Sequence, residues 1–137
     1  MSSQQSSRLI AIVDDDKSVQ TALQDLIESE GLSTLCFDSA EQFLDSGAQR
    51  KAACLIADVR MPGMSGIELQ AKLKADRPGI PIIFITAHGD AKMRVQAMRN
   101  GAVEFLTKPF DNAVLLETVY AAVEDYIKVS GLWDTNR

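Results

Sequence analysis

Short apolar runs that alternate with helical patterns are the feature that most limits the fold of this chain. Each run holds four to six residues and ends at a polar residue. Runs of this kind are typical of parallel strands that are covered on both faces. The five expected strands cover residues 9–13, 32–37, 53–57, 80–85 and 103–106. Helices are expected over about residues 16–30, 39–47, 65–77, 89–100 and 111–128.

This alternation predicts the α/β class, with a five-stranded doubly wound parallel sheet, five helices and right-handed crossovers. We expect the strand order 2-1-3-4-5 of flavodoxin-like (βα)5 sheets. The 137 residues suit one domain. We expect that domain to occupy residues 8–128, between a disordered tail (1–7) and a C-terminal tail or linker (129–137).

Helix starts are marked by capping signals. Ser39 with Gln42, and Ser65 with Glu68, have the spacing of a capping box. The segment after Ser65 alternates apolar and polar residues, which by periodicity alone indicates a strand. Its capping box and its Leu, Ala, Lys, Glu and Gln content favour a helix instead.

The composition excludes several classes of protein. A net charge of −5 argues against direct nucleic-acid binding through a broad basic face. No apolar run reaches the roughly 20 residues of a membrane helix, and the polar N-terminus is no signal peptide. Cys36 and Cys54 lie in apolar runs and are expected to be buried thiols. These features favour a cytoplasmic protein without a membrane partner.

Polar residues follow four of the expected strands. Asp14 and Asp15 follow the first strand, and Asp58 follows the third. Thr86 follows the fourth strand, and Lys108 follows the fifth. The carboxyl ends of parallel strands meet at one edge, so three carboxylates are expected to crowd one crevice. A divalent cation such as Mg²⁺ relieves that repulsion. With a lysine and a hydroxyl nearby, the set suits phosphoryl transfer to an aspartate.

Four stretches together resemble the receiver domain of two-component response regulators, in the CheY-like superfamily. They are Val13-Asp-Asp-Asp16, Asp58-Val-Arg-Met-Pro-Gly-Met-Ser-Gly66, Phe84-Ile-Thr-Ala87 and Gly101-Ala-Val-Glu-Phe-Leu-Thr-Lys-Pro-Phe110. The similarity covers roughly residues 8–128. The stretch around Asp58 most resembles receivers that precede small helix-turn-helix output domains. No residue of the family's motifs is missing at these positions.

The resemblance implies a phosphoacceptor switch, not an enzyme beyond its own phosphorylation and dephosphorylation. Asp58 would accept the phosphoryl group from a phosphohistidine on a sensor histidine kinase. Asp15, Asp58 and the backbone carbonyl of Arg60 would bind Mg²⁺, with Asp14 acting mainly through a coordinated water. His88 and Arg60 would lie at the rim and tune water access.

The resemblance also implies the parts of a switch. Lys108 would pair with the phosphoryl group, while Thr86 moves to hydrogen-bond it and Phe105 turns inward. Ala87 would be small to allow access to the phosphoryl group. The peptide bond between Lys108 and Pro109 would be cis. The changed surface would be built from the last strand and its two flanking helices.

A phosphorylation-dependent homodimer through that surface is plausible. Four apolar residues on those helices can serve either the interface or the core: Val95, Met98, Val119 and Val123. We expect the first two to point inward.

Two other functions compete with the switch. Asp14-x-Asp16 has the spacing of an aspartate-nucleophile phosphatase of haloacid-dehalogenase type, but that assignment leaves Asp58 and Phe105 unexplained. A passive interaction module would show neither phosphorylation nor Mg²⁺ affinity. The aspartates after the first strand could also cap the following helix, a role that Asp16 can fill alone.

Overall fold

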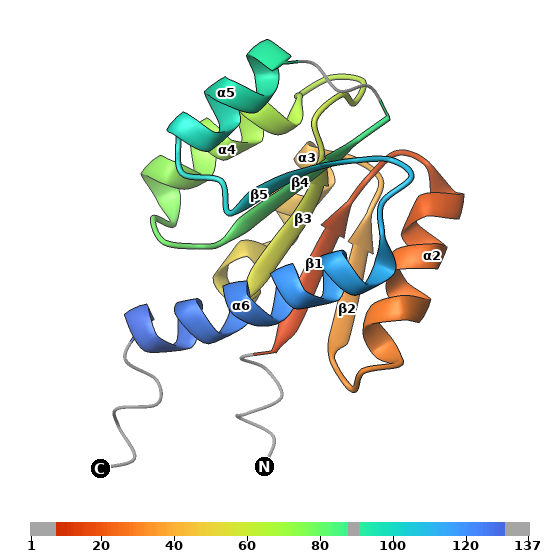
Figure 1. The fold of residues 1–137 in the computed structure, drawn as a ribbon. Coiled ribbons are helices and arrows are strands. Elements are labelled where there is room, and N and C mark those ends of the chain that lie inside the picture. Colours follow the sequence, from red (N-terminus) through yellow and green to blue (C-terminus); the bar gives the residue numbers. More distant parts are fainter. Residues whose placement is uncertain (1–7, 88–90, 131–137) are drawn as a thin grey trace.

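The computed structural model describes residues 8–87 and 91–130, with the side chains of the last helix described to residue 124. Five strands alternate with five α-helices, as predicted, and a short 3-10 turn adds to them (Figure 1). In chain order the elements are β1 (Leu9–Val13), α2 (Lys17–Glu28), β2 (Ser33–Phe37), α3 (Ala40–Ser46), η1 (Ala48–Arg50), β3 (Cys54–Asp58), α4 (Gly66–Asp76), β4 (Ile82–Thr86), α5 (Ala91–Arg99), β5 (Glu104–Thr107) and α6 (Asn112–Ser130).

The five strands form one parallel sheet in the order β2-β1-β3-β4-β5, which confirms the predicted topology. The register pairs Val13 of β1 with Ala57 of β3. The next residues, Asp14 just past β1 and Asp58 at the end of β3, therefore lie side by side at this edge. The strand order reverses between β1 and β3, because β2 lies on one side of β1 and β3 on the other, so this crevice is the switch point of the sheet.

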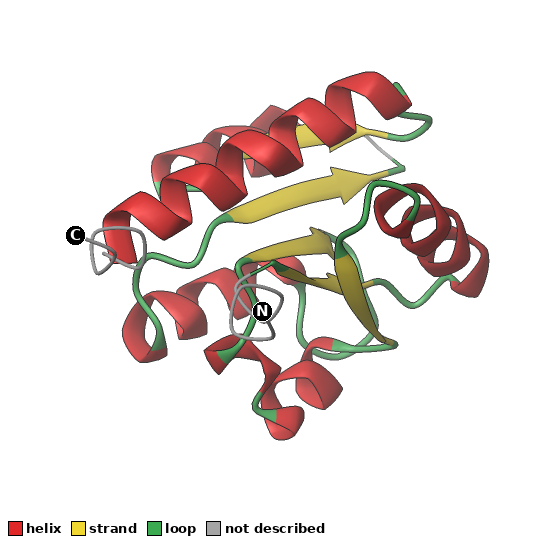
Figure 2. Cartoon of the chain, turned by 90° about the horizontal axis from the view of Figure 1, so that it is seen from below, coloured by secondary structure: helices red, strands yellow, loops and turns green. Residues whose placement is uncertain are grey.

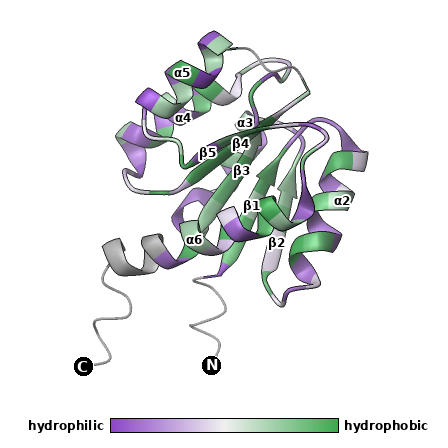
Figure 3. Cartoon of the chain, in the orientation of Figure 1, coloured by the Kyte–Doolittle hydropathy of each residue, from purple (hydrophilic) through white to green (hydrophobic). Residues whose placement is uncertain are grey.

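Helices cover both faces of the sheet (Figure 2). One core joins α3, α4 and α5 to one face, and the other joins α2 and α6 to the opposite face. Alternate residues of a strand point to opposite faces, so the central strands contribute to both cores. The first core takes Ala11, Leu55, Ala57 and Phe84, and the second takes Ile10, Ile12, Ile56 and Ile83. The strands of the sheet are mostly apolar, whereas the helices carry both apolar and polar residues (Figure 3).

The capping signals are confirmed at one helix and half confirmed at another. At α4, Glu68 N–H donates to Ser65 Oγ and Ser65 N–H donates to Glu68 Oε1, a complete capping box. This segment is helical despite its alternating pattern. At α3, Gln42 N–H donates to Ser39 Oγ, but Gln42 Oε1 accepts from the N–H of Asp38. The predicted box is therefore incomplete there.

The expectation that Val95 and Met98 point inward is wrong. Both lie on the outside of α5, with exposed fractions of 53% and 38%. Three of the nine residues of this helix are charged, and its buried residue is the small Ala97. Ala97, together with the partly buried Met93, packs against the first core, so Val95 and Met98 lie outside the face of α5 that meets this core.

Three other expectations need comment. Cys54 is buried, but Cys36 is only half-buried because β2 is an edge strand. The tails at 1–7 and 131–137 lie outside the described residues, and α6 continues to Ser130. Among the described residues, the search for a helix with the length and apolarity to cross a bilayer finds none.

Candidate functional site

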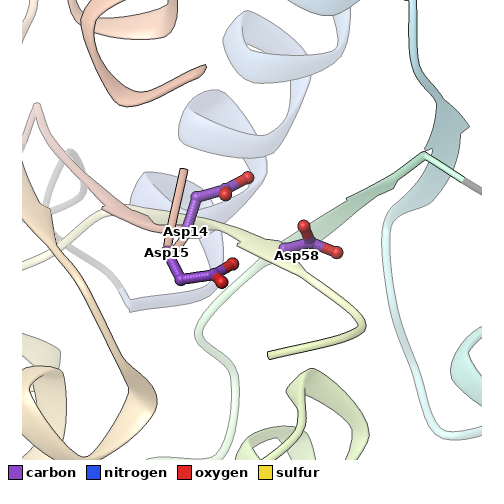
Figure 4. A group of neighbouring side chains, drawn as sticks. All are labelled: Asp14, Asp15 and Asp58. Carbon is purple, nitrogen blue, oxygen red and sulfur yellow. The ribbon is translucent and has the colours of Figure 1, made fainter. Parts of the chain in front are cut away.

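Three carboxylates meet at the carboxyl end of the sheet (Figure 4). Asp14 and Asp15 follow β1, and Asp58 ends β3. One oxygen from each lies within 4.8 Å of the others. Side chains more than 40 residues apart in sequence are thus brought together by the strand register, as predicted.

Asp14 and Asp58 are both buried, with exposed fractions of 0% and 7%. Burial raises the pKa of the Asp14 carboxyl group, and the nearby charge of Asp58 adds to the rise. One oxygen of Asp14 accepts the N–H of Asp16 at 2.9 Å, which opposes part of this effect. Asp15, by contrast, is exposed. The group therefore combines two buried acids with a solvent-accessible one.

Lys108 supplies a positive charge to the crevice. Its Nζ donates to Asp14 Oδ2 and to Asp58 Oδ2, both at 3.1 Å. Burial lowers the pKa of Lys108, but the hydrogen bonds and charges of the two aspartates outweigh burial and raise it. The lysine is therefore held charged between both acids. Its single charge leaves the crevice negative overall.

Thr86 ends β4 beside this group and is almost fully buried. Its carbonyl accepts the backbone N–H of Lys108 at 2.7 Å. The pairing of Thr86 with Thr107 places Lys108 just past the end of β5. The peptide bond between Lys108 and Pro109 is cis, the geometry that the resemblance implies.

The loop between β3 and α4 borders the crevice. Its start is joined to the site because the N–H of Arg60 donates to Asp58 Oδ1 at 3.0 Å. Its end is closed by a bond from Gly66 N–H to the carbonyl of Val59 at 2.9 Å. A Cβ at Gly66 would lie 2.5 Å from the Asp58 carbonyl oxygen, so glycine is required for this close approach.

Phe105 of β5 is buried, with its ring centroid 6.3 Å from that of Phe84. This is the inward position that the resemblance assigns to the switched state. Arg94 of α5 holds it there: its Nη1 donates to the Phe105 carbonyl at 2.9 Å, and its guanidinium lies 5.9 Å from the ring centroid. Glu104 adds a long ion pair to Arg94 at 3.8 Å.

Three residues around the site were not predicted from the sequence. Arg94 contacts the Phe105 carbonyl and Glu41 accepts the N–H of Met64, and no local sequence pattern indicates either contact. Gln20 is buried on the apolar face of α2, where its Nε2 donates to the carbonyl of Asp14 at 2.6 Å and to Asp38 Oδ1 at 2.8 Å. A glutamine at helical spacing from Leu23 and from the buried Ile27 was a signal that could have identified it.

Other site predictions have mixed outcomes. Ala87 is exposed just after β4, whereas His88 lies outside the described residues. Asp16 does not join the acidic group as a phosphatase pair with Asp14 would require. It is the N-cap of α2, with its carboxylate accepting from Ser18 and Val19. The phosphatase hypothesis therefore finds no support here.

The donor set fits a magnesium ion. Mg²⁺ takes oxygen ligands at about 2.1 Å, so opposite ligands lie about 4 Å apart. The three carboxylate oxygens span little more than that distance. Their repulsion is only partly relieved by Lys108. Asp14, Asp15 and Asp58 thus provide the hard anionic ligands and the unbalanced charge that this ion requires.

The chain is similar to known proteins over most of its length. The sequence model described as "Response regulator receiver domain" matches residues 10–120. Response regulator protein TodT of Pseudomonas putida is 49% identical over 116 residues, which cover 85% of this chain and 51% of TodT. Transcriptional regulatory protein FixJ of Azorhizobium caulinodans is 42% identical over 114 residues, covering 83% of this chain and 54% of FixJ.

A solved structure agrees with these relatives. The response regulator StyR superposes with a TM-score of 0.84 at 44% sequence identity, covering 93% of this chain and 65% of the StyR chain. The chain spans about half the length of the curated relatives it matches.

Proposed function

This chain belongs to the response regulator receiver domain family, whose members are phosphoacceptor switches, and from that premise we propose that Asp58 is its phosphorylation site. The donor would be a phosphohistidine on a sensor histidine kinase. A carboxylate oxygen of Asp58 attacks phosphorus, the nitrogen–phosphorus bond breaks, and the imidazole leaves and takes up a proton. The product is an aspartyl phosphate, later hydrolysed by water.

The observation that carries this proposal is the pair of hydrogen bonds that Lys108 Nζ donates to Asp14 Oδ2 and Asp58 Oδ2, at 3.1 Å each. The ammonium group thus lies beside the carboxylate of the proposed acceptor. The ammonium can move from the carboxylate to the incoming phosphoryl oxygens, where negative charge must be stabilised. Thr86 ends β4 at the same edge of the sheet. Its hydroxyl is proposed to donate to the phosphoryl oxygens as well.

We further propose that Asp15, Asp58 and the Arg60 carbonyl bind Mg²⁺, with Asp14 acting through a coordinated water. When bound, the ion neutralises charge on the acceptor and on the phosphoryl group. Asp14 and Asp15 would help to hold the ion, and Lys108 would orient the phosphoryl group. Arg60, Ala87 and His88 are proposed to control water access from the rim.

The proposed output is a change at the surface formed by α5, β5 and α6. Thr86 and Phe105 would shift together, and phosphorylation would favour the inward ring. Val95 and Met98 are exposed on α5 and suit a homodimer contact. Val119 and Val123 are buried in the second core and do not.

We propose that the receiver acts in the cytoplasm and controls a transcriptional output. TodT and FixJ are about twice as long as the matched segment, and FixJ is a transcriptional regulatory protein. The receiver itself would contact no nucleic acid, since its net charge is −5.

Acetyl phosphate with Mg²⁺ tests the proposal directly. We expect the chain to gain the mass of one phosphoryl group, and peptide mapping to place it at Asp58. A phosphoryl group at Asp14 would support the phosphatase alternative instead. The absence of both labelling and Mg²⁺ binding would indicate a passive interaction module.

A further inference from the structure

The loop that follows Asp58 is held from outside by Glu41, a residue of α3. The backbone N–H of Met64 donates to Glu41 Oε2 at 2.9 Å. Glu41 lies in the first turn of α3, so this hydrogen bond joins that helix to the loop between β3 and α4. Glu41 is not part of the carboxylate group at the strand ends.

The backbone at Gly63 shows how closely the carboxylate fits this loop. Gly63 has a φ of +77°, a conformation that side chains disfavour. A Cβ at this position would also lie 2.7 Å from Glu41 Oε2. Glycine therefore allows both the turn and the approach of the carboxylate.

The two ends of this turn are thus held by different carboxylates. Asp58 accepts the N–H of Arg60 at 3.0 Å, and Glu41 accepts the N–H of Met64 at 2.9 Å. Met61, between them, is buried in the first core. These contacts limit the conformations open to the Arg60 backbone, whose carbonyl is a proposed magnesium ligand.

We propose that Glu41 is a positioning residue for magnesium binding. By accepting the Met64 N–H it sets the turn from Arg60 to Gly63, and so the direction of the Arg60 carbonyl. Glu41 acts on the ion only through this backbone. The inference rests on the proposed function of the site and adds a residue from α3 to it.

Calorimetric Mg²⁺ titration of the whole chain tests the role of Glu41. Glu41→Ala removes the acceptor and is expected to raise the magnesium Kd about tenfold, as loss of an indirect partner does in other metal sites. Glu41→Gln keeps an acceptor oxygen and is expected to bind nearly as tightly as the wild type. Labelling by acetyl phosphate should slow in Glu41→Ala at low Mg²⁺ and recover at saturating Mg²⁺.

Gly63→Ala provides an independent variant, with Gly79→Ala as its matched control. Both replace a glycine with positive φ, but a Cβ at Gly79 meets nothing within 4 Å. We expect only Gly63→Ala to weaken magnesium binding, while both lower stability. The double variant Glu41→Ala/Gly63→Ala should lose less affinity than the two single losses combined, because both changes disrupt one contact.

The outcomes separate this inference from the proposed function. A wild-type chain that is labelled at Asp58, with Glu41→Ala binding Mg²⁺ normally, overturns the role of Glu41 alone. Equal weakening in Glu41→Ala and Glu41→Gln would assign the effect to charge and also overturn the positioning role. A wild-type chain with neither labelling nor Mg²⁺ affinity overturns the proposed function itself.

Discussion

Lys108 Nζ lies 3.1 Å from Asp58 Oδ2, although 50 positions separate these residues in the sequence. The contact exists because β3 and β5 flank β4 in a parallel sheet and end at the same edge. The lysine also bonds Asp14 at the same distance. One cation thus counteracts two acids in the crevice where a metal ion is proposed to bind.

Replacing Lys108 should affect metal binding and phosphorylation in opposite directions. Lys108→Ala removes a charge that repels Mg²⁺, so magnesium affinity should rise several-fold. It also removes the ammonium that stabilises the phosphoryl oxygens, so labelling by acetyl phosphate should slow about a hundredfold. Lys108→Arg, which keeps the charge, should leave the magnesium Kd near the wild-type value. A parallel fall in affinity and labelling would contradict this division.

The buried carboxyl group of Asp14 is expected to cost stability in Mg²⁺-free buffer. Its pKa is raised above the ordinary value of 3.8, so folding favours the protonated form. The penalty is therefore fully present above the raised pKa and disappears as the pH falls below 3.8. Asp14→Asn should raise the free energy of unfolding by about 1 kcal/mol at pH 7.

Urea denaturation with EDTA at pH 7 and at pH values lowered stepwise towards 3.8 measures this effect, with the exposed Asp45→Asn as the control. The stabilisation of Asp14→Asn should shrink on acidification. This expectation is contradicted if Asp14→Asn is less stable than the wild type at pH 7. It is also contradicted if the stability difference between the two grows as the pH falls, since burial would then not dominate the pKa of Asp14. The same variant should lose most of its Mg²⁺ affinity.

Arg94 is expected to bias the position of Phe105. Arg94→Ala removes the hydrogen bond to the Phe105 carbonyl and the cation above its ring, which should lower the free energy of unfolding by about 1 kcal/mol. The inward ring should become less populated, so labelling by acetyl phosphate and subsequent dimerisation should weaken. Arg94→Lys should restore only part of the lost stability and labelling, because lysine lacks the planar guanidinium group of arginine. Unchanged labelling in Arg94→Ala would separate this residue from the switch.

Gly66 should be the glycine of the site loop that is least tolerant of a side chain. A Cβ would lie 2.5 Å from the Asp58 carbonyl and 2.9 Å from the Phe84 ring. Gly66→Ala is expected to cost about 3 kcal/mol of unfolding free energy, since neither neighbour can move freely. Gly31→Ala meets no neighbour but has a φ of +86°, and should cost only about 1 kcal/mol. Similar thermal shifts for both would contradict the steric argument.

The sequence was sufficient to predict the meeting of Asp14, Asp58 and Lys108. Parallel strands end at one edge, so residues that follow apolar runs can be placed without knowing any side-chain contact. The helical state of α4 was equally predictable because its capping signals are local. These predictions depend on regular elements and on their order in the sheet.

Contacts made across loops could not be predicted in the same way. The bond from Met64 to Glu41 depends on the path of a loop and on the position of a helix that precedes it. The outward direction of Val95 depends on how closely α5 packs through Ala97. Gln42 had a suitable spacing for a capping box, yet its side chain accepts from the N–H of Asp38 at 3.0 Å.

Phosphoryl transfer from a phosphorylated sensor kinase to the wild-type chain and to Asp58→Asn, each with Mg²⁺ and with EDTA, tests the central claim most directly. The account predicts that label reaches the wild-type chain only with Mg²⁺ and does not reach Asp58→Asn at a comparable rate. Transfer to Asp58→Asn at the wild-type rate, or transfer that persists in EDTA, would contradict it.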